Sequence, residues 1–190
     1  MHEYSVFYEA TPNPQSMKFV VTAPIASEAV NFTSVQEAAR SPLALKIFGF
    51  PWAAGVFIGP SFVTVTKQEW VDWDILAEPL SELIKEHLNR GEPVLVEKAT
   101  ADSADEAGNA ENPNDLPVVR RIKQILREEI RPAVAMDGGD IVFERYEEGR
   151  VYLRMQGACS GCPSSVYTLK EGIETRLREA VPEVREVFSV

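Results

Sequence analysis

Hydrophobic and polar positions along the chain repeat with two different periods, and these periods indicate the elements. Apolar residues recur every three to four positions over 74–89 and 118–130, which predicts two helices that each bury one face. A third helix is expected over 163–180. Short apolar runs predict strands over 4–8, 17–21, 93–97, 141–146, 150–156 and 184–190. Because helices and hairpins are segregated along the chain, we expect an α+β fold class.

The longest run without a charged residue, Ile47 to Thr66, has enough residues to span a bilayer. Glycines and prolines interrupt it, and it ends in the alternating residues 62–66. Two strands that turn at Gly59-Pro60-Ser61 account for this pattern better than one membrane helix. We therefore expect a buried hairpin and no membrane association.

Local signals predict where several elements begin and end. Ser34 with Glu37 forms a capping box, and Ser41-Pro42 predicts a second short helix with proline in its first turn. Pro132 is expected to kink or end the helix over 118–130. The Asp137-Gly138-Gly139-Asp140 sequence predicts the turn into the following strands.

An acidic, polar segment divides the chain. Residues 99–117 contain five acidic residues, no basic residue and one large apolar residue, Leu116. Such a segment buries too little apolar surface to offset its chain entropy. We predict two small α+β domains, over 1–98 and 118–190, joined by a flexible acidic linker over 99–117.

Composition narrows the possible functions. The 190 residues include 19 basic and 29 acidic ones, a net charge of −10, which argues against a nucleic-acid or anionic-membrane binder. Two cysteines are too few for a secreted disulfide scaffold. The first ten residues contain no Lys or Arg, unlike a secretory or organelle targeting segment, so we expect a reducing, cytoplasmic location.

Both cysteines fall in one motif, Gly157-Ala158-Cys159-Ser160-Gly161-Cys162-Pro163. The three-residue step can bring both sulfurs to one side of a turn, where they can bridge each other or share a soft metal. Pro163 predicts a helix start, so the pKa of Cys162 should fall near the positive end of the helix dipole. We expect both thiols in an exposed loop without the apolar surroundings of an inert core cysteine.

The spacing alone leaves several functions open. A single C-x-x-C motif occurs in structural disulfides, in dithiol redox sites and as half of a zinc or iron–sulfur site. Zinc and iron–sulfur clusters require four ligands, whereas this chain has two cysteines, and both histidines, His2 and His87, lie in the other domain. A complete cysteine site therefore requires two chains, and a shared, exposed cluster suits transfer. A dithiol oxidoreductase and a zinc-stapled adaptor remain the alternatives.

The motif and its surroundings resemble a known family. MDGGDI, VYLRMQGACSGCPSS, TLKEGIE and VPEVREV resemble the C-terminal domain of NifU-like (Nfu-type) iron–sulfur cluster carriers. TPNP, SPLA and FVTVTK resemble the family's N-terminal domain, regarded as a partner-recognition or accessory module. The resemblance implies a non-enzymatic homodimer that binds a [4Fe–4S] cluster through Cys159 and Cys162 of each chain.

The same resemblance implies partners. Upstream assembly machinery would supply the cluster, and apo iron–sulfur proteins would receive it. An aerobically prepared sample is expected to lack the cluster.

Other candidate residues have simpler structural interpretations. Asp137 and Asp140 are expected to shape the turn, and His87 is expected to interact with a helix dipole rather than a metal. Most members of the aromatic set are expected in the core, although a group near Pro51 could be exposed and bind a partner. That set contains Phe48, Phe50, Trp52, Phe57, Trp70 and Trp73.

Overall fold

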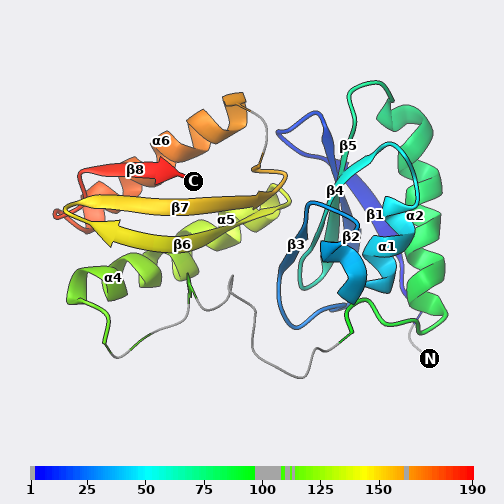
Figure 1. Cartoon of the computed structure of the whole chain (residues 1–190), viewed down its shortest axis with the longest axis horizontal. Helices are drawn as coiled ribbons and strands as arrows, with labels where there is room; N and C mark the ends of the chain where they lie inside the picture. The colour runs from blue at the N-terminus through cyan, green and yellow to red at the C-terminus, as the bar shows by residue number, and fades with distance from the viewer. Residues whose placement is uncertain (1–2, 97–107, 110–111, 113, 161–162) are drawn as a thin grey trace. The chain divides into compact units, whose positions relative to one another are not determined.

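The computed structural model describes residues 3–96, 108–109, 112, 114–160 and 163–190. They form two compact units, Met1–Asp102 and Ser103–Val190 (Figure 1). Each unit has its own sheet and its own apolar core, which confirms the expected α+β class. Most of the predicted linker over 99–117 lies outside the described residues, and its flexibility there stays a prediction, whereas Asn109 is buried and Pro117 already belongs to a helix.

The first unit contains an antiparallel five-stranded sheet with the order β1-β2-β5-β4-β3. Its strands are β1 (Val6–Ala10), β2 (Ser16–Val21), β3 (Val30–Phe32), β4 (Ala53–Ile58) and β5 (Phe62–Lys67). The predicted hairpin is confirmed, because β4 pairs with β5 and the Gly59 N–H donates to the Phe62 carbonyl at 2.8 Å. None of the described helices meets the length and hydropathy that a membrane crossing requires.

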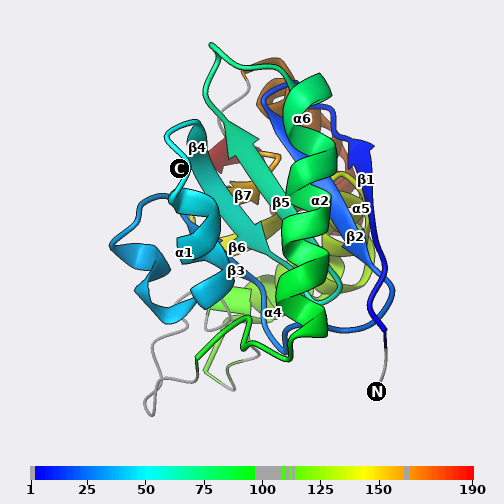
Figure 2. The same ribbon diagram turned by 90° about the vertical axis from the view of Figure 1, so that its right-hand side faces the viewer.

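Two helices, α1 (Pro42–Phe48) and α2 (Trp73–Asn89), lie on one face of this sheet (Figure 2). A short 3-10 helix, η1 (Glu37–Arg40), precedes α1. Alternate strand residues such as Phe19, Val56 and Val65 pack in the same core as Ile84 of α2. Residues 93–96 form no strand, contrary to the prediction over 93–97, and residue 97 lies outside the described residues.

The second unit packs helices against a three-stranded sheet with the order β6-β7-β8. Its elements are α4 (Pro117–Ile125), the π-helix η2 (Leu126–Ile130), α5 (Arg131–Met136), β6 (Gly139–Glu147), β7 (Arg150–Gly157), α6 (Pro163–Ala180) and β8 (Glu186–Ser189). Strands β6 and β7 are antiparallel, whereas β8 joins β7 in parallel after α6. The core-facing residues of β7, Val151, Leu153 and Met155, alternate along the strand.

Pro132 does not end the helical segment that begins at Pro117, so of the two predicted effects, a kink or an end, the end is wrong. Proline cannot donate the hydrogen bond that an α-helix requires, and its ring collides with the carbonyl four residues earlier. A wider π turn over Leu126–Ile130 lies just before the proline, where α-helical hydrogen bonding would be interrupted. Helix α5 then continues to Met136.

An aromatic stack crosses the sheet of the second unit. The Tyr152 and Phe188 rings stack with centroids 5.2 Å apart and planes inclined by 19°. The Arg145 guanidinium lies 3.7 Å from the Tyr152 ring centre, and the Lys170 ammonium lies 5.3 Å from that of Phe188. The stack joins side chains of all three strands and of α6.

Candidate functional site

Cys159 lies in the loop that follows β7, beside the start of β6. The loop begins at Gly157, whose φ of 64° is the left-handed conformation that glycine tolerates best. The Ala158 N–H donates to the Gly138 carbonyl at 3.1 Å, which ties the loop to the turn before β6. The Ser160 N–H and hydroxyl both donate to the Gly157 carbonyl, at 3.1 and 2.8 Å. The end of the β6–β7 ladder thus positions this thiol.

The Cys159 thiol is buried, which corrects the prediction of an exposed loop thiol. Its residue is 5% exposed, and its side chain belongs to the apolar core of the second unit. Burial raises the pKa of Cys159 to about 12, and the Asp137 and Asp140 carboxylates add to the rise. Cys159 is a free thiol. It is therefore protonated at neutral pH in this conformation.

Gly139 makes room for the sulfur. A Cβ at this position would lie 2.5 Å from the Cys159 Sγ and 2.7 Å from the Gln156 carbonyl oxygen. Gly139 also pairs with Gly157 at the end of the ladder, so two residues without side chains face each other beside the thiol. Only glycine fits here without moving either the thiol or the backbone.

Asp140 connects the site to the preceding helix. Its carboxylate accepts two hydrogen bonds from the Arg131 guanidinium, at 2.8 and 2.7 Å. One of the same carboxylate oxygens also accepts the Ile141 N–H at 2.8 Å. A bidentate, half-buried pair of this kind fixes the beginning of β6 against α5. Spacing predicted the turn but not this pair, because Arg131 carries no local signal that it faces Asp140.

Cys162, the second predicted ligand, lies outside the described residues, so the predicted fall in its pKa stays a prediction. Among the described side chains, no group of three or more His, Cys, Asp or Glu residues could hold a metal ion. The described part of the site therefore offers one soft ligand, the Cys159 sulfur.

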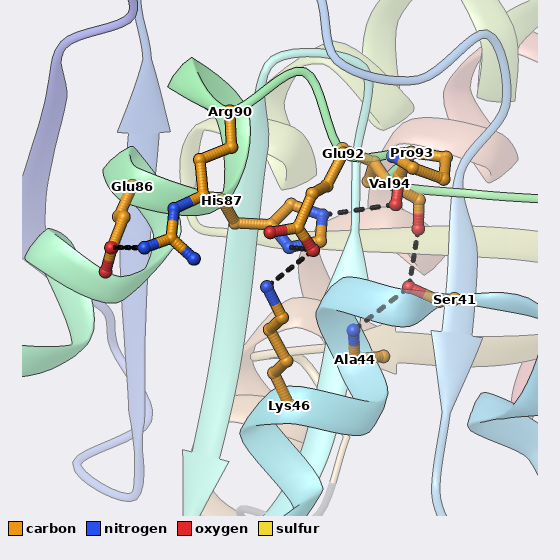
Figure 3. A network of polar contacts seen from close by, with 9 residues as sticks. All are labelled: Ser41, Ala44, Lys46, Glu86, His87, Arg90, Glu92, Pro93 and Val94. Carbon is orange, nitrogen blue, oxygen red and sulfur yellow. Dashed lines mark hydrogen bonds and ion pairs between the residues drawn. The ribbon is translucent and has the colours of Figure 1, made fainter.

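His87 lies in the last turn of α2, the position that the expected dipole interaction requires, but it is buried. It is 1% exposed, and its Nε2 lies 3.1 Å from the Pro93 carbonyl oxygen (Figure 3). Its Nδ1 lies 3.5 Å from a Glu92 carboxylate oxygen, which also pairs with the Lys46 ammonium at 2.6 Å. Burial, the largest effect, lowers the pKa of His87, and Lys46 lowers it further. The imidazole joins α2 to the segment that follows it.

The aromatic residues of the first unit are divided between core and surface. Trp52 is buried, and Phe50 stacks on it with ring centroids 5.3 Å apart. The Trp73 indole N–H donates to the Pro14 carbonyl, whereas Trp70 is 68% exposed. Phe50, directly before Pro51, is 39% exposed, which confirms part of the expected exposure at this place, and the exposed tryptophan is Trp70.

Comparisons with known proteins place both units in one family. Residues 122–188 match the NifU-like domain, and residues 6–91 match the family described as scaffold protein Nfu/NifU N terminal. The chain is 40% identical over 182 residues to the Homo sapiens NFU1 iron-sulfur cluster scaffold homolog, mitochondrial, covering 95% of this chain and 69% of that protein. It is 42% identical to the Arabidopsis thaliana NifU-like protein 4, mitochondrial, covering 94% of this chain and 63% of that protein.

Among solved structures, a NifU-like protein from Saccharomyces cerevisiae matches with 26% identity and a TM-score of 0.44, over 49% of this chain and 85% of that one. The family assignment rests on the sequence matches, which cover both units. The chain therefore belongs to the Nfu/NifU family of iron–sulfur cluster scaffold proteins, which are cluster carriers and not enzymes.

Proposed function

We propose that this chain binds a [4Fe–4S] cluster between the C-x-x-C motifs of two copies and delivers it to apo iron–sulfur proteins. The observation that supports the proposal is the number of cysteine ligands that one chain can provide. The chain has two cysteines, three residues apart, and the described one, Cys159, is held at the end of the β6–β7 ladder. Four thiolates are the usual ligand set of such a cluster, so two chains supply one set.

Because Cys159 is buried, the loop that holds it must rearrange before its sulfur can bind a cluster. Only the thiolate binds iron, so capture by Cys159 requires loss of a proton from a thiol whose pKa is raised. Burial by its own core also prevents a shared cluster from reaching the sulfur in the described conformation. We therefore propose that the loop after β7 opens when iron binds, and that the released proton passes to solvent.

Upstream assembly machinery would supply the cluster, and cluster-free proteins would receive it. We propose a reducing compartment such as the cytoplasm for this exchange, because ligand thiols must stay reduced between loads.

Anaerobic reconstitution with iron and sulfide tests the proposal. We expect the absorption spectrum of a [4Fe–4S] cluster, four irons per two chains, and a shift from monomer to dimer in analytical ultracentrifugation. A chain that remains colourless, or a monomer that holds a complete cluster alone, would contradict it. Half an equivalent of zinc per chain with no iron would favour the zinc-stapled adaptor. Disulfide reductase activity without iron would favour the dithiol oxidoreductase.

Variants test the ligands. Cys159→Ser and Cys162→Ser should each abolish cluster binding and cluster-linked dimerisation. Because Cys159 is buried, its replacement by the more polar serine should also destabilise the second unit by about 1–3 kcal/mol. Ser160→Ala is the matched control, since it changes a neighbouring loop hydroxyl and leaves both thiols in place. Circular dichroism confirms that each variant is folded before iron is measured.

A further inference from the structure

The free edge of β6 is the part of the second unit where the predicted linker meets the sheet. Strand β6 has a neighbour on one side, β7, and its other side is an edge of the sheet. Edge strands present unpaired N–H and C=O groups that can pair with another chain. In β6, Ile141 and Phe143 direct their backbone groups toward this edge.

Two residues of the predicted linker lie against that edge. The Asn109 side-chain N–H donates to the Ile141 carbonyl at 3.0 Å. The Oδ1 atom of the same side chain accepts the Phe143 N–H at 2.9 Å. The amide thereby makes the same donor and acceptor pair that the peptide group of a neighbouring strand would make. Asn109 is 9% exposed, so these bonds are shielded from water.

Gly108 brings the backbone close to the same strand. A Cβ at this position would lie 2.4 Å from the Phe143 carbonyl oxygen, so a side chain here would push the segment away from the edge. The close approach of Gly108 and the two amide bonds of Asn109 are independent observations that both place this segment on β6.

A second anchor holds the segment further along. The Asp115 carboxylate pairs with the buried Lys123 ammonium at 2.8 Å, and that ammonium lies 5.3 Å from the Phe143 ring centre. Every part of Phe143 therefore has a neighbour from this region. Asn109 accepts its N–H, Gly108 lies against its carbonyl, and Lys123, paired with Asp115, lies near its ring.

Two further features interrupt the edge of β6. The Ile141 N–H donates to the Asp140 carboxylate, and the register of β6 shifts between Phe143 and Arg145. A bulge of this kind interrupts the regular edge that a partner strand needs. We propose that Gly108 and Asn109 form a strap that closes the free edge of β6 and prevents a second copy of this chain from pairing along it.

Amide hydrogen exchange of the iron-free, reduced full chain tests the contact. The Phe143 N–H should exchange slowly in the wild type although it lies at a sheet edge. In Asn109→Ala its protection should fall at least tenfold, because its acceptor is removed. Asn114→Ala, which removes an exposed amide from the same segment, should leave it unchanged. Rapid exchange in the wild type, or equal protection in wild type and Asn109→Ala, would overturn the strap.

Sedimentation of the same samples tests the consequence. Asn109→Ala should form dimers whose fraction rises with concentration, whereas the wild type and Asn114→Ala should remain monomeric. If Asn109→Ala loses Phe143 protection and still sediments as a monomer, the strap has no role against self-pairing. Should Asn109→Ala fail to fold, Asn109→Asp replaces it, since this change keeps an acceptor for Phe143 and places an oxygen against the Ile141 carbonyl. All samples are iron-free, so the outcome is independent of cluster binding.

Discussion

At Cys159, burial and two nearby carboxylates act in the same direction, since each disfavours the thiolate. We expect the native, iron-free Cys162→Ser variant, whose one remaining thiol is Cys159, to react with iodoacetamide at pH 8 at least ~100-fold more slowly than a model cysteine peptide. Mass spectrometry of quenched samples measures the rate. The same variant in urea should react at the peptide rate, and equal rates with and without urea would contradict the buried, protonated thiol.

Gly139 and Gly172 make a matched pair of glycines in the second unit. Gly139→Ala forces a Cβ against the Cys159 sulfur and the Gln156 carbonyl, so it should destabilise this unit by about 1–3 kcal/mol and reduce iron loading. Gly172→Ala meets no atom within 4 Å in the interior of α6 and should stabilise by up to about 1 kcal/mol. Urea unfolding followed by circular dichroism measures both changes. Equal effects on stability would contradict the close contact between Gly139 and the Cys159 sulfur.

His87 predicts how the stability of the first unit depends on pH. Its folded pKa lies below the unfolded value near 6.5, so the unfolded chain binds the proton first as pH falls. The free energy of unfolding should therefore fall below about pH 6.5, by at most ~1.4 kcal/mol per pH unit. Fluorescence-monitored urea unfolding reports this unit, because all three tryptophans lie in it.

Two variants separate the histidine from its neighbour. His87→Gln should flatten the dependence between about pH 6.5 and 5. In Glu92→Gln the dependence in this interval should remain, because the pKa of the half-buried Glu92 carboxyl is lowered from an ordinary value near 4.5 and its titration lies at more acid pH. An unchanged slope in His87→Gln would show that another group titrates.

At the scale of elements, Ser41 joins α1 to the segment after α2. Its hydroxyl oxygen accepts the Ala44 N–H at 3.0 Å, and its proton goes to the Val94 carbonyl at 2.6 Å (Figure 3). Ser41→Ala leaves both groups unpaired in a buried site and should cost about 1–3 kcal/mol. Ser34→Ala is the control, because the Ser34 hydroxyl accepts the exposed Glu37 N–H at a long distance of 3.4 Å. Fluorescence-monitored unfolding measures both variants. An equal loss of stability in the two would contradict the double role of Ser41.

Elements with local signals agree closely with their sequence predictions. Helix α6 begins at Pro163 and ends at Ala180 as predicted, and the hairpin turns at Gly59-Pro60-Ser61. The exceptions depend on contacts between distant segments. The burial of Cys159 results from its approach to Gly139, twenty positions earlier, and no local pattern reports that distance.

At the scale of the whole molecule, two separate cores predict two pieces that fold alone. The protease Glu-C cleaves after glutamate, and Glu97 and Glu106 lie between the main elements of the two units. We expect brief digestion to cut there and to release fragments that keep their circular dichroism. A cut after Glu106 leaves Gly108 and Asn109 attached to β6. Resistance to cleavage, or fragments that unfold on release, would contradict the independence of the units.

The aromatic stack of the second unit limits what its sheet can recognise. Several RNA-binding modules capture bases on aromatic rings that a sheet presents to solvent. Here Tyr152 and Phe188 cover each other, and Arg145 and Lys170 lie at the two ends of the pair. A nucleobase would have to displace a ring or a cation before it could stack. Each of the two aromatic rings on this sheet already contacts the other ring and one cation of its own chain.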